Sequence, residues 1–103
     1  MKVIRSKDFT APNAWGALDI AAMADATVRL HWTDQPYGWH VNDGEEVFVV
    51  LDGIVEMHYM LDGADRAATL ETGDVFHVGA GEGHSAHPRG QARVLVIERA
   101  GSV

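Results

Sequence analysis

The chain has 103 residues, which is the size of a single domain with one buried core. Apolar residues make up 47% of it and charged residues 22%, as in folded globular proteins, so the composition excludes a disordered or fibrous chain. Fifteen acidic against eight basic residues give a formal charge of -7, which repels a phosphate backbone and argues against a nucleic-acid partner.

The absence of cysteine narrows the possible chemistry further. It excludes disulfides, iron–sulfur clusters and thiol catalysis, so a bound metal would need nitrogen and oxygen ligands. Residues 1–8 lack the apolar core of a signal peptide, and no window approaches the roughly 20 apolar residues of a membrane span. We therefore expect a cytoplasmic protein without a membrane partner.

The first 26 residues are expected to form an N-terminal arm of one domain that spans residues 1–103. Within this arm, the alanine-rich stretch from Asp19 to Ala24 is the one helical candidate, and an extended conformation is an equal alternative. The core is expected over about residues 27–99, where short apolar segments alternate with turn residues. Its strands are predicted at Ala26 to Trp32, Tyr37 to Val41, Glu46 to Asp52, Ile54 to Leu61, Ala67 to Leu70, Val75 to Val78, His84 to His87 and Ala92 to Arg99.

Two Asp-Gly pairs interrupt the middle of the chain. Asp52-Gly53 lies between apolar runs and predicts a two-residue hairpin turn, because a type I′ turn needs positive φ at both central residues. Asp62-Gly63 repeats the signal, with a looser loop expected to continue to Arg66. Successive hairpins without a helical crossover indicate an antiparallel up-and-down or Greek-key barrel rather than a parallel sheet.

Strand parity sorts the six histidines, since alternate residues of a strand face opposite sides. His58 alternates with the more apolar residues of its strand, such as Met57, and is expected at the surface. His31 lies on the opposite face from Leu30 and its apolar neighbours, and His77 is flanked by apolar residues of the other face. By this pattern all three are poor candidates for metal ligands.

The remaining histidines converge with other polar residues on one predicted site. His40 and Asn42 share a face of one strand, and Glu46 begins the next strand. His84 follows much later, after a glycine-rich corner at residues 79–83. Because a barrel can bring distant hairpins together, these side chains predict a mixed nitrogen and oxygen site for Zn, Mn, Fe, Ni or Co, with positions left for water or substrate.

Two motifs in this region resemble those of the cupin superfamily. Residues 40–46, followed by six residues and Gly53, resemble the first cupin motif, in which HxH, three or four residues, Glu, six residues and Gly recur. Gly73-Asp74, with Gly79, Gly81 and His84 following, resembles the second motif, GDxxxxPxGxxH. The resemblance extends over about residues 27–99, and it implies an antiparallel double-stranded β-helix, or jelly-roll, barrel.

The resemblance also implies one divalent metal ion inside the barrel, held at positions that correspond to His40, Asn42, Glu46 and His84. The sequence departs from the family pattern at Asn42, which replaces the second histidine of the first motif. An amide oxygen is a weaker and harder ligand than imidazole, so we expect lower affinity, and a harder metal or an additional water. Outside the ligand set, Gly79 replaces a proline, Asp34 stands where the first motif has its leading glycine, and Pro88 replaces the final asparagine.

Two further residues compete for a place in the site. Glu45 is a rival for Glu46, but only Glu46 is followed by the apolar alternation and the six-residue gap to Gly53, so Glu45 is expected in solvent. His87 has the opposite parity to His84 and is a reserve ligand that a bulge could turn inward. The alternative without metal is a set of polar groups that only form hydrogen bonds, although a buried unpaired carboxylate is costly.

Apolar residues suggest a pocket and a subunit interface. Six could line a pocket for a small apolar or aromatic molecule, and each could equally be core: Trp39, Tyr37, Trp32, Phe48, Met57 and Phe76. Five others form apolar stripes on a second strand face: Val47, Val49, Leu51, Leu95 and Ile97. Because such a face needs cover from the second sheet or another subunit, a homodimer is expected.

Three functions are compatible with this sequence. The first is a small cupin-type protein that binds one divalent metal ion, and the second is a metal-dependent dioxygenase, isomerase or lyase in which Glu46 or a metal-bound water is the base. The third is a metal-free barrel that binds a small molecule. No arginine is evident inside the predicted barrel, which weakens the enzyme hypothesis, and the sequence identifies neither catalytic residues nor a substrate.

Overall fold

The computed structural model describes residues 1–101, which form nine β-strands and one short 3-10 helix. The elements are η1 (Ser6–Asp8), β1 (Gly16–Met23), β2 (Ala26–Thr33), β3 (Tyr37–Val41), β4 (Glu46–Asp52), β5 (Val55–Leu61), β6 (Ala64–Leu70), β7 (Val75–Val78), β8 (Gly83–Pro88) and β9 (Ala92–Arg99). The predicted all-β class is confirmed. Within the same residues, no helix has the length and apolar character needed to cross a membrane.

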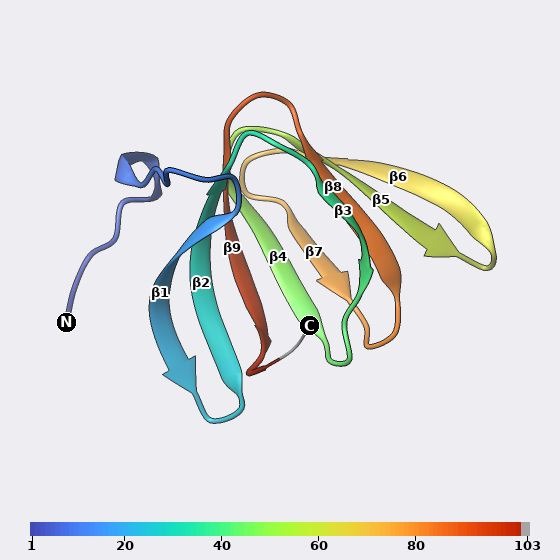
Figure 1. Cartoon of the computed structure of the whole chain (residues 1–103), viewed down its shortest axis with the longest axis horizontal. Helices are drawn as coiled ribbons and strands as arrows, with labels where there is room; N and C mark the ends of the chain where they lie inside the picture. The colour runs from blue at the N-terminus through green and yellow to red at the C-terminus, as the bar shows by residue number, and fades with distance from the viewer. Residues whose placement is uncertain (102–103) are drawn as a thin grey trace.

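The strands form two antiparallel sheets, in the order β1-β2-β9-β4-β7 and β3-β8-β5-β6 (Figure 1). The chain changes sheet at every connection except β1–β2 and β5–β6. This alternation between two facing sheets is the jelly-roll arrangement, and it confirms the predicted double-stranded β-helix. It also places β3 beside β8 and β4 beside β9, so residues distant in sequence become neighbours.

The two Asp-Gly pairs have exchanged the roles that the sequence predicted. Asp62 and Gly63 have φ of 51° and 76° and join β5 to β6 with Leu61 paired to Ala64, which is the tight two-residue hairpin. The expected loop up to Arg66 is wrong, since β6 already begins at Ala64.

Asp52-Gly53 instead carries the chain from one sheet to the other, because β4 and β5 lie in different sheets. The predicted hairpin turn at this point is wrong. Gly53 has φ of 87°, and a Cβ there would lie 2.5 Å from the carbonyl oxygen of Gln91. Close backbone approach and positive φ therefore require glycine at this crossing.

The helical candidate from Asp19 to Ala24 is a strand up to Met23, and Ala24 lies in the turn that follows. This strand is β1, which pairs with β2 from Gly16 opposite Trp32 to Met23 opposite Ala26. The pairing shifts register between Asp19 and Ala21, as at a β-bulge. Alanine propensity is a weak preference that hydrogen bonding to a neighbouring strand overrides, so part of the expected N-terminal arm is an edge strand.

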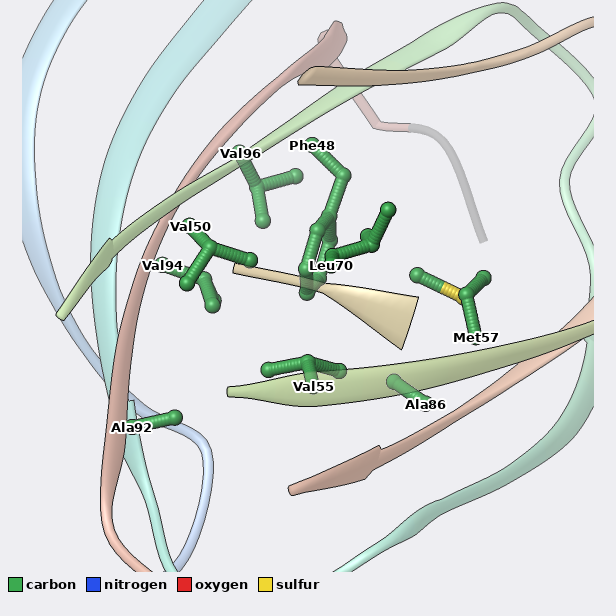
Figure 2. Packing of buried hydrophobic residues seen from close by; sticks show 9 residues of the cluster. All are labelled: Phe48, Val50, Val55, Met57, Leu70, Ala86, Ala92, Val94 and Val96. Atoms are coloured by element: carbon green, nitrogen blue, oxygen red, sulfur yellow. The ribbon is translucent and has the colours of Figure 1, made fainter. Parts of the chain in front are cut away.

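The apolar core lies between the two sheets (Figure 2). It consists of Phe48, Val50, Val55, Met57, Leu70, Ala86, Ala92, Val94 and Val96. On β5 the inward residues Val55 and Met57 are fully buried, as their parity predicted. The core fills one end of the barrel, and polar side chains occupy the space beside it.

The inward face of β2 is the reverse of the one predicted. Leu30 is buried, but its β1 partner Leu18 lies with Phe9 and other N-terminal residues around a hollow on the outer face of the sheet. N-terminal residues therefore cover this apolar face, and η1 lies against β4. The alternate residues Arg29 and His31 consequently face the barrel interior.

Candidate metal centre and its cavity

Three predicted site residues meet at one end of the barrel. His40 on β3 and His84 on β8 are direct cross-strand neighbours, with ring centroids 4.1 Å apart. Glu46 begins β4 in the opposite sheet, and the Gly81 N–H donates to the Asn42 carbonyl at 2.9 Å, which ties the turn before β8 to the β3–β4 connection. One ligand atom each of His40, Glu46 and His84 lies within 4.8 Å of the others. We call these three side chains the ligand group.

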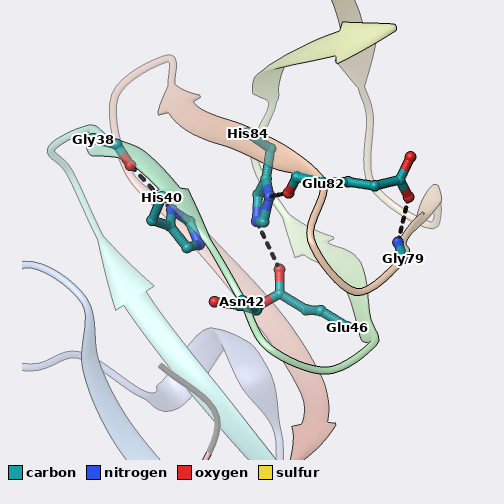
Figure 3. Close-up of polar contacts among 7 residues, drawn as sticks. All are labelled: Gly38, His40, Asn42, Glu46, Gly79, Glu82 and His84. Atoms are coloured by element: carbon teal, nitrogen blue, oxygen red, sulfur yellow. Dashed lines mark hydrogen bonds and ion pairs between the residues drawn. The ribbon is translucent and has the colours of Figure 1, made fainter.

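Both imidazoles of the ligand group are oriented by backbone carbonyls (Figure 3). His40 Nδ1 lies 3.0 Å from the Gly38 carbonyl oxygen, and His84 Nδ1 lies 3.1 Å from that of Glu82. A carbonyl only accepts, so each Nδ1 carries the proton and donates it. The Nε2 atom of each ring is then directed to the shared space, which is the arrangement of metal-binding histidines.

Glu46 and His84 form a buried ion pair. His84 Nε2 lies 3.3 Å from Glu46 Oε1, and the two residues are 1% and 6% exposed. The contact is close but poorly aligned, so His84 Nε2 has no well-formed hydrogen bond within residues 1–101. Burial would lower the pKa of His84 and raise that of Glu46, but their mutual contact and opposite charges outweigh it and shift both pKa values the other way.

Asn42 supports the carboxylate of the ligand group. Its Nδ2 donates to Glu46 Oε2 at 2.9 Å, and the residue is only 4% exposed. Oε1 of Glu46 faces His84 at the same time, so both oxygens of the carboxylate are held. This geometry makes Asn42 a positioning residue for Glu46, and its predicted role as a direct ligand stays a prediction.

Glu98 is a polar neighbour of the site that the sequence did not reveal. It is the cross-strand partner of Glu46 on β9, and both face the same cavity. Burial, followed by the contact with Glu46, raises the pKa of Glu98 to about 7. Glu98 lies on the same strand face as the core residues Val94 and Val96, and this parity could have identified it as an interior residue. The pair can share one proton between two carboxylates.

A cavity of about 390 Å³ opens beside the ligand group. Among the predicted pocket residues, Tyr37, Phe48 and Met57 line it. Three others do not: Trp32, Trp39 and Phe76. The cavity is therefore bounded by the ligand group, the apolar core and one wall of the five-stranded sheet.

Trp15 covers part of this cavity and was not predicted. It precedes β1 with φ of 63°, and its indole N–H donates to the Gln35 carbonyl at 2.9 Å. Its ring packs edge-on against Tyr37, and its carbonyl accepts a hydrogen bond from His31 Nδ1 at 2.9 Å. The sequence pattern placed Trp15 in the N-terminal arm, which gave no signal for a role in the interior.

Two further predictions about the interior are wrong. His31, interpreted as facing away from the barrel interior, lines the cavity, and burial lowers its pKa. Arg29 also lines the cavity, although no arginine was expected inside the barrel. Both predictions failed because the outer face of β2 is covered. Leu30 is therefore buried although it does not face the barrel interior.

The other histidines lie away from the ligand group. His77 Nε2 contacts Glu45 Oε1 at 3.0 Å, and both side chains are exposed, as was predicted for Glu45. His58 and His87 pack ring against ring, with centroids 4.5 Å apart, on the face of the four-stranded sheet opposite the core residue Met57. The reserve ligand His87 thus points away from the cavity.

The second motif forms the turns that position His84. Asp74 Oδ2 accepts a hydrogen bond from the Glu71 N–H at 2.8 Å, which closes the turn before β7. The Glu82 carboxylate accepts one from the Gly79 N–H at 2.6 Å and closes the turn before β8. Glu82 thus orders this turn with its side chain and orients His84 with its carbonyl.

Residues 28–98 match the cupin domain family, and this match covers more than half of the chain. The chain belongs to the cupin family. No curated protein matches the sequence. Among solved structures, this cupin resembles a cupin-2 domain containing protein from Shewanella frigidimarina, with 25% identity, 94% of each chain covered and a TM-score of 0.79.

Two other solved structures share the cupin fold at lower identity. A cupin superfamily protein from Desulfitobacterium hafniense is 16% identical, with 92% of this chain and 86% of that chain covered and a TM-score of 0.78. Hydroxypropylphosphonic acid epoxidase from S. wedmorenis is 17% identical, with 71% of this chain and 42% of that chain covered and a TM-score of 0.63. At these identities the likeness shows the shared fold alone.

Proposed function

We propose that this cupin binds one divalent metal ion through His40, Glu46 and His84. The supporting observation is the convergence of their three ligand atoms within 4.8 Å, from two sheets, on the wall of a cavity. Both imidazoles present Nε2 to the same point, and the buried His84 Nε2 has no well-formed hydrogen bond. An ion would give His84 Nε2 a bonding partner and would balance the negative charge of the buried Glu46 carboxylate.

The ligand chemistry limits which ion binds. Two imidazole nitrogens and a carboxylate suit Zn, Mn, Fe, Ni or Co, and three protein ligands leave coordination positions toward the cavity. Asn42 hydrogen-bonds to Glu46 and can position its carboxylate. After rotation of its amide, Asn42 could instead supply its side-chain oxygen as a fourth metal ligand. We therefore expect weaker binding than in a site with three histidines.

A second candidate function is metal-dependent catalysis on a small molecule. The observation that favours it is the cavity beside the ligand group, which holds titratable Glu98 next to Glu46. A bound ion would supply Lewis-acid polarisation of a substrate oxygen. Glu98 would hold a proton at its carboxyl oxygen within the cavity, and Trp15 with Tyr37 would restrict access of water.

Elemental analysis of purified protein tests the metal proposal. Wild type, His84→Ala and the matched control His77→Ala are purified without chelator and analysed for Mn, Fe, Co, Ni and Zn. We expect near-stoichiometric metal in wild type and His77→Ala and a nearly complete loss in His84→Ala. Equal metal in all three variants would refute the site, and its absence from all three after reconstitution would favour the metal-free ligand-binding barrel.

We also propose that the protein is a homodimer that associates through the outer face of the five-stranded sheet. Val47, Val49 and Leu51 on β4 remain only half buried there, although η1 lies against this strand. A monomeric mass by light scattering would refute this proposal. The expected cytoplasmic location and the absence of nucleic-acid and membrane partners stay predictions from the sequence.

A further inference from the structure

Among the described residues that line the cavity, Arg29 is the cationic side chain of the five-stranded sheet, on the wall opposite the paired strands β3 and β8. It lies in the middle of β2, and β9 separates β2 from β4, which carries Glu46 (Figure 1). Adjacent strands are about 4.8 Å apart, so the β2 and β4 backbones are roughly 10 Å apart. A small molecule lying across β9 could therefore contact both Arg29 and the ligand group.

The guanidinium of Arg29 makes only a weak interaction with the protein. Its Nε lies 2.9 Å from Asp19 Oδ1 on β1, but the N–H does not point along this line, so the buried Nε has no well-formed hydrogen bond to any described residue. The Asp19 side chain is 80% exposed, and such an ion pair is weak in water. A planar guanidinium presents five N–H donors in a fork that matches a carboxylate.

The space between Arg29 and the ligand group has apolar walls. Trp15, Tyr37 and Phe48 line the cavity, with Val96 as the direct partner of Arg29 on β9. Aromatic and aliphatic surfaces with a few placed polar groups are typical of sites for small organic molecules. The site would therefore hold a carbon skeleton between its two polar ends.

We propose that the cavity binds a small organic acid, whose carboxylate pairs with Arg29 and whose second oxygen or nitrogen atom faces the ligand group. The part that concerns the second atom rests on the proposed metal site, whereas the pairing with Arg29 does not. With a divalent ion in place, the ion and Arg29 carry three positive charges, which balance the negative charges of Glu46, Glu98 and the exposed Asp19. The loaded cavity therefore no longer repels an anion, and the Arg29 guanidinium favours a carboxylate over a neutral molecule.

Two matched ligand pairs test this assignment by calorimetry. The acids 4-hydroxybenzoate and 4-oxopentanoate are each compared with the corresponding neutral amide, in zinc-loaded and in chelator-treated protein. We expect wild type to bind at least one acid about tenfold or more tightly than its amide, as one charge-assisted hydrogen bond would give. Zinc should tighten the binding of both members of that pair.

Variants of the two charged partners sharpen the test. Arg29→Gln should reduce the acid preference to less than about twofold, and Arg29→Lys should retain part of it, because lysine keeps the charge but loses the fork. Asp19→Asn removes the competing carboxylate and should tighten acid binding by about twofold to threefold. Zinc content should match wild type in all three variants, since Arg29 and Asp19 lie outside the ligand group.

Equal affinity for acid and amide in both pairs would overturn the inference. So would an acid preference that Arg29→Gln leaves unchanged, or an Asp19→Asn variant that binds acids more weakly than wild type. An acid preference that depends on Arg29 in protein without any zinc affinity would support the pairing with Arg29 and would refute the proposed metal site.

Discussion

The two polar walls of the cavity hold their side chains in different ways. On the β3–β8 wall, His40 and His84 are each oriented by a hydrogen bond to a backbone carbonyl. On the β2–β9 wall, the Trp15 carbonyl holds His31 in the same way, but within residues 1–101 the charged side chains of Arg29 and Glu98 contact other charged side chains and hydrogen-bond to no backbone group. A backbone partner leaves an imidazole little freedom, whereas a pair of side chains can rearrange around a ligand.

The β3–β8 wall is therefore the preorganised one. A metal ion requires ligand atoms at fixed positions, which the β3–β8 wall and Glu46 provide. A variable organic molecule is better served by groups that can move, which the β2–β9 wall provides. The comparison predicts that changes on the first wall abolish metal binding and that changes on the second alter ligand preference or stability.

The largest expected effect is the difference in metal affinity between a variant of His40 on one wall and a variant of His31 on the other. His40→Ala should weaken metal affinity by more than about 100-fold, since loss of a direct ligand should exceed the effect of losing an outer partner. His31→Ala should leave it within about threefold, because His31 hydrogen-bonds Trp15 and lies outside the ligand group. Competition with a chelator of known affinity measures both. Equal losses of metal affinity in the two variants would contradict the proposed difference between the walls.

A smaller effect is expected at Asn42. Asn42→Ala removes the hydrogen bond that holds Glu46 Oε2 and should weaken metal binding by about tenfold to 100-fold, as for other outer-shell partners. The same chelator competition measures it, and Ser85→Ala on the outer face of β8 is a buried polar control. Unchanged affinity in Asn42→Ala would show that Glu46 is held without Asn42.

Glu98 should control how the metal-free protein responds to pH. A carboxyl group with its pKa raised to about 7 favours the folded state when protonated, so its contribution is present below pH 4.5 and is lost as pH rises to about 7. Glu98→Gln should therefore recover about 1 kcal/mol of stability at pH 8 relative to pH 5, allowing for solvent screening. Urea unfolding in chelator measures this, and parallel pH profiles would contradict it.

The smallest expected effect comes from the His84–Glu46 pair. The lowered pKa of Glu46 adds stability above pH 4.5 that is lost as pH falls, and the raised pKa of His84 adds stability below pH 6.5 that is lost as pH rises. Glu46→Gln should thus cost most between these values, by less than about 1 kcal/mol because desolvation offsets the attraction. Metal-free unfolding across this range is the measurement, and a cost independent of pH would argue against the pair.

The ligand group could be predicted because its signal is local and specific. Spacing within residues 40–46 and the glycine-rich corner before His84 identified both motifs, and the barrel topology brought them together. The strands β3, β4, β7 and β9 also have the predicted bounds, since each lies between clear turn residues.

The β2 part of the β2–β9 wall could not be predicted from parity alone. Parity identifies the inward face only when the other face meets solvent, and on β2 the outer residue Leu30 is buried as well. Trp15 and β1 were not predicted because the position of this segment depends on its pairing with β2 rather than on its own sequence. Long-range pairing therefore determined what the local pattern could not.

The most direct test of the central claim is an anomalous difference map from a crystal grown with Zn²⁺. We predict one strong peak inside the barrel, within about 2.3 Å of Nε2 of His40, Nε2 of His84 and a carboxylate oxygen of Glu46. A peak at the outer-face histidines His58 and His87, or none inside the barrel at saturating zinc, would contradict the account.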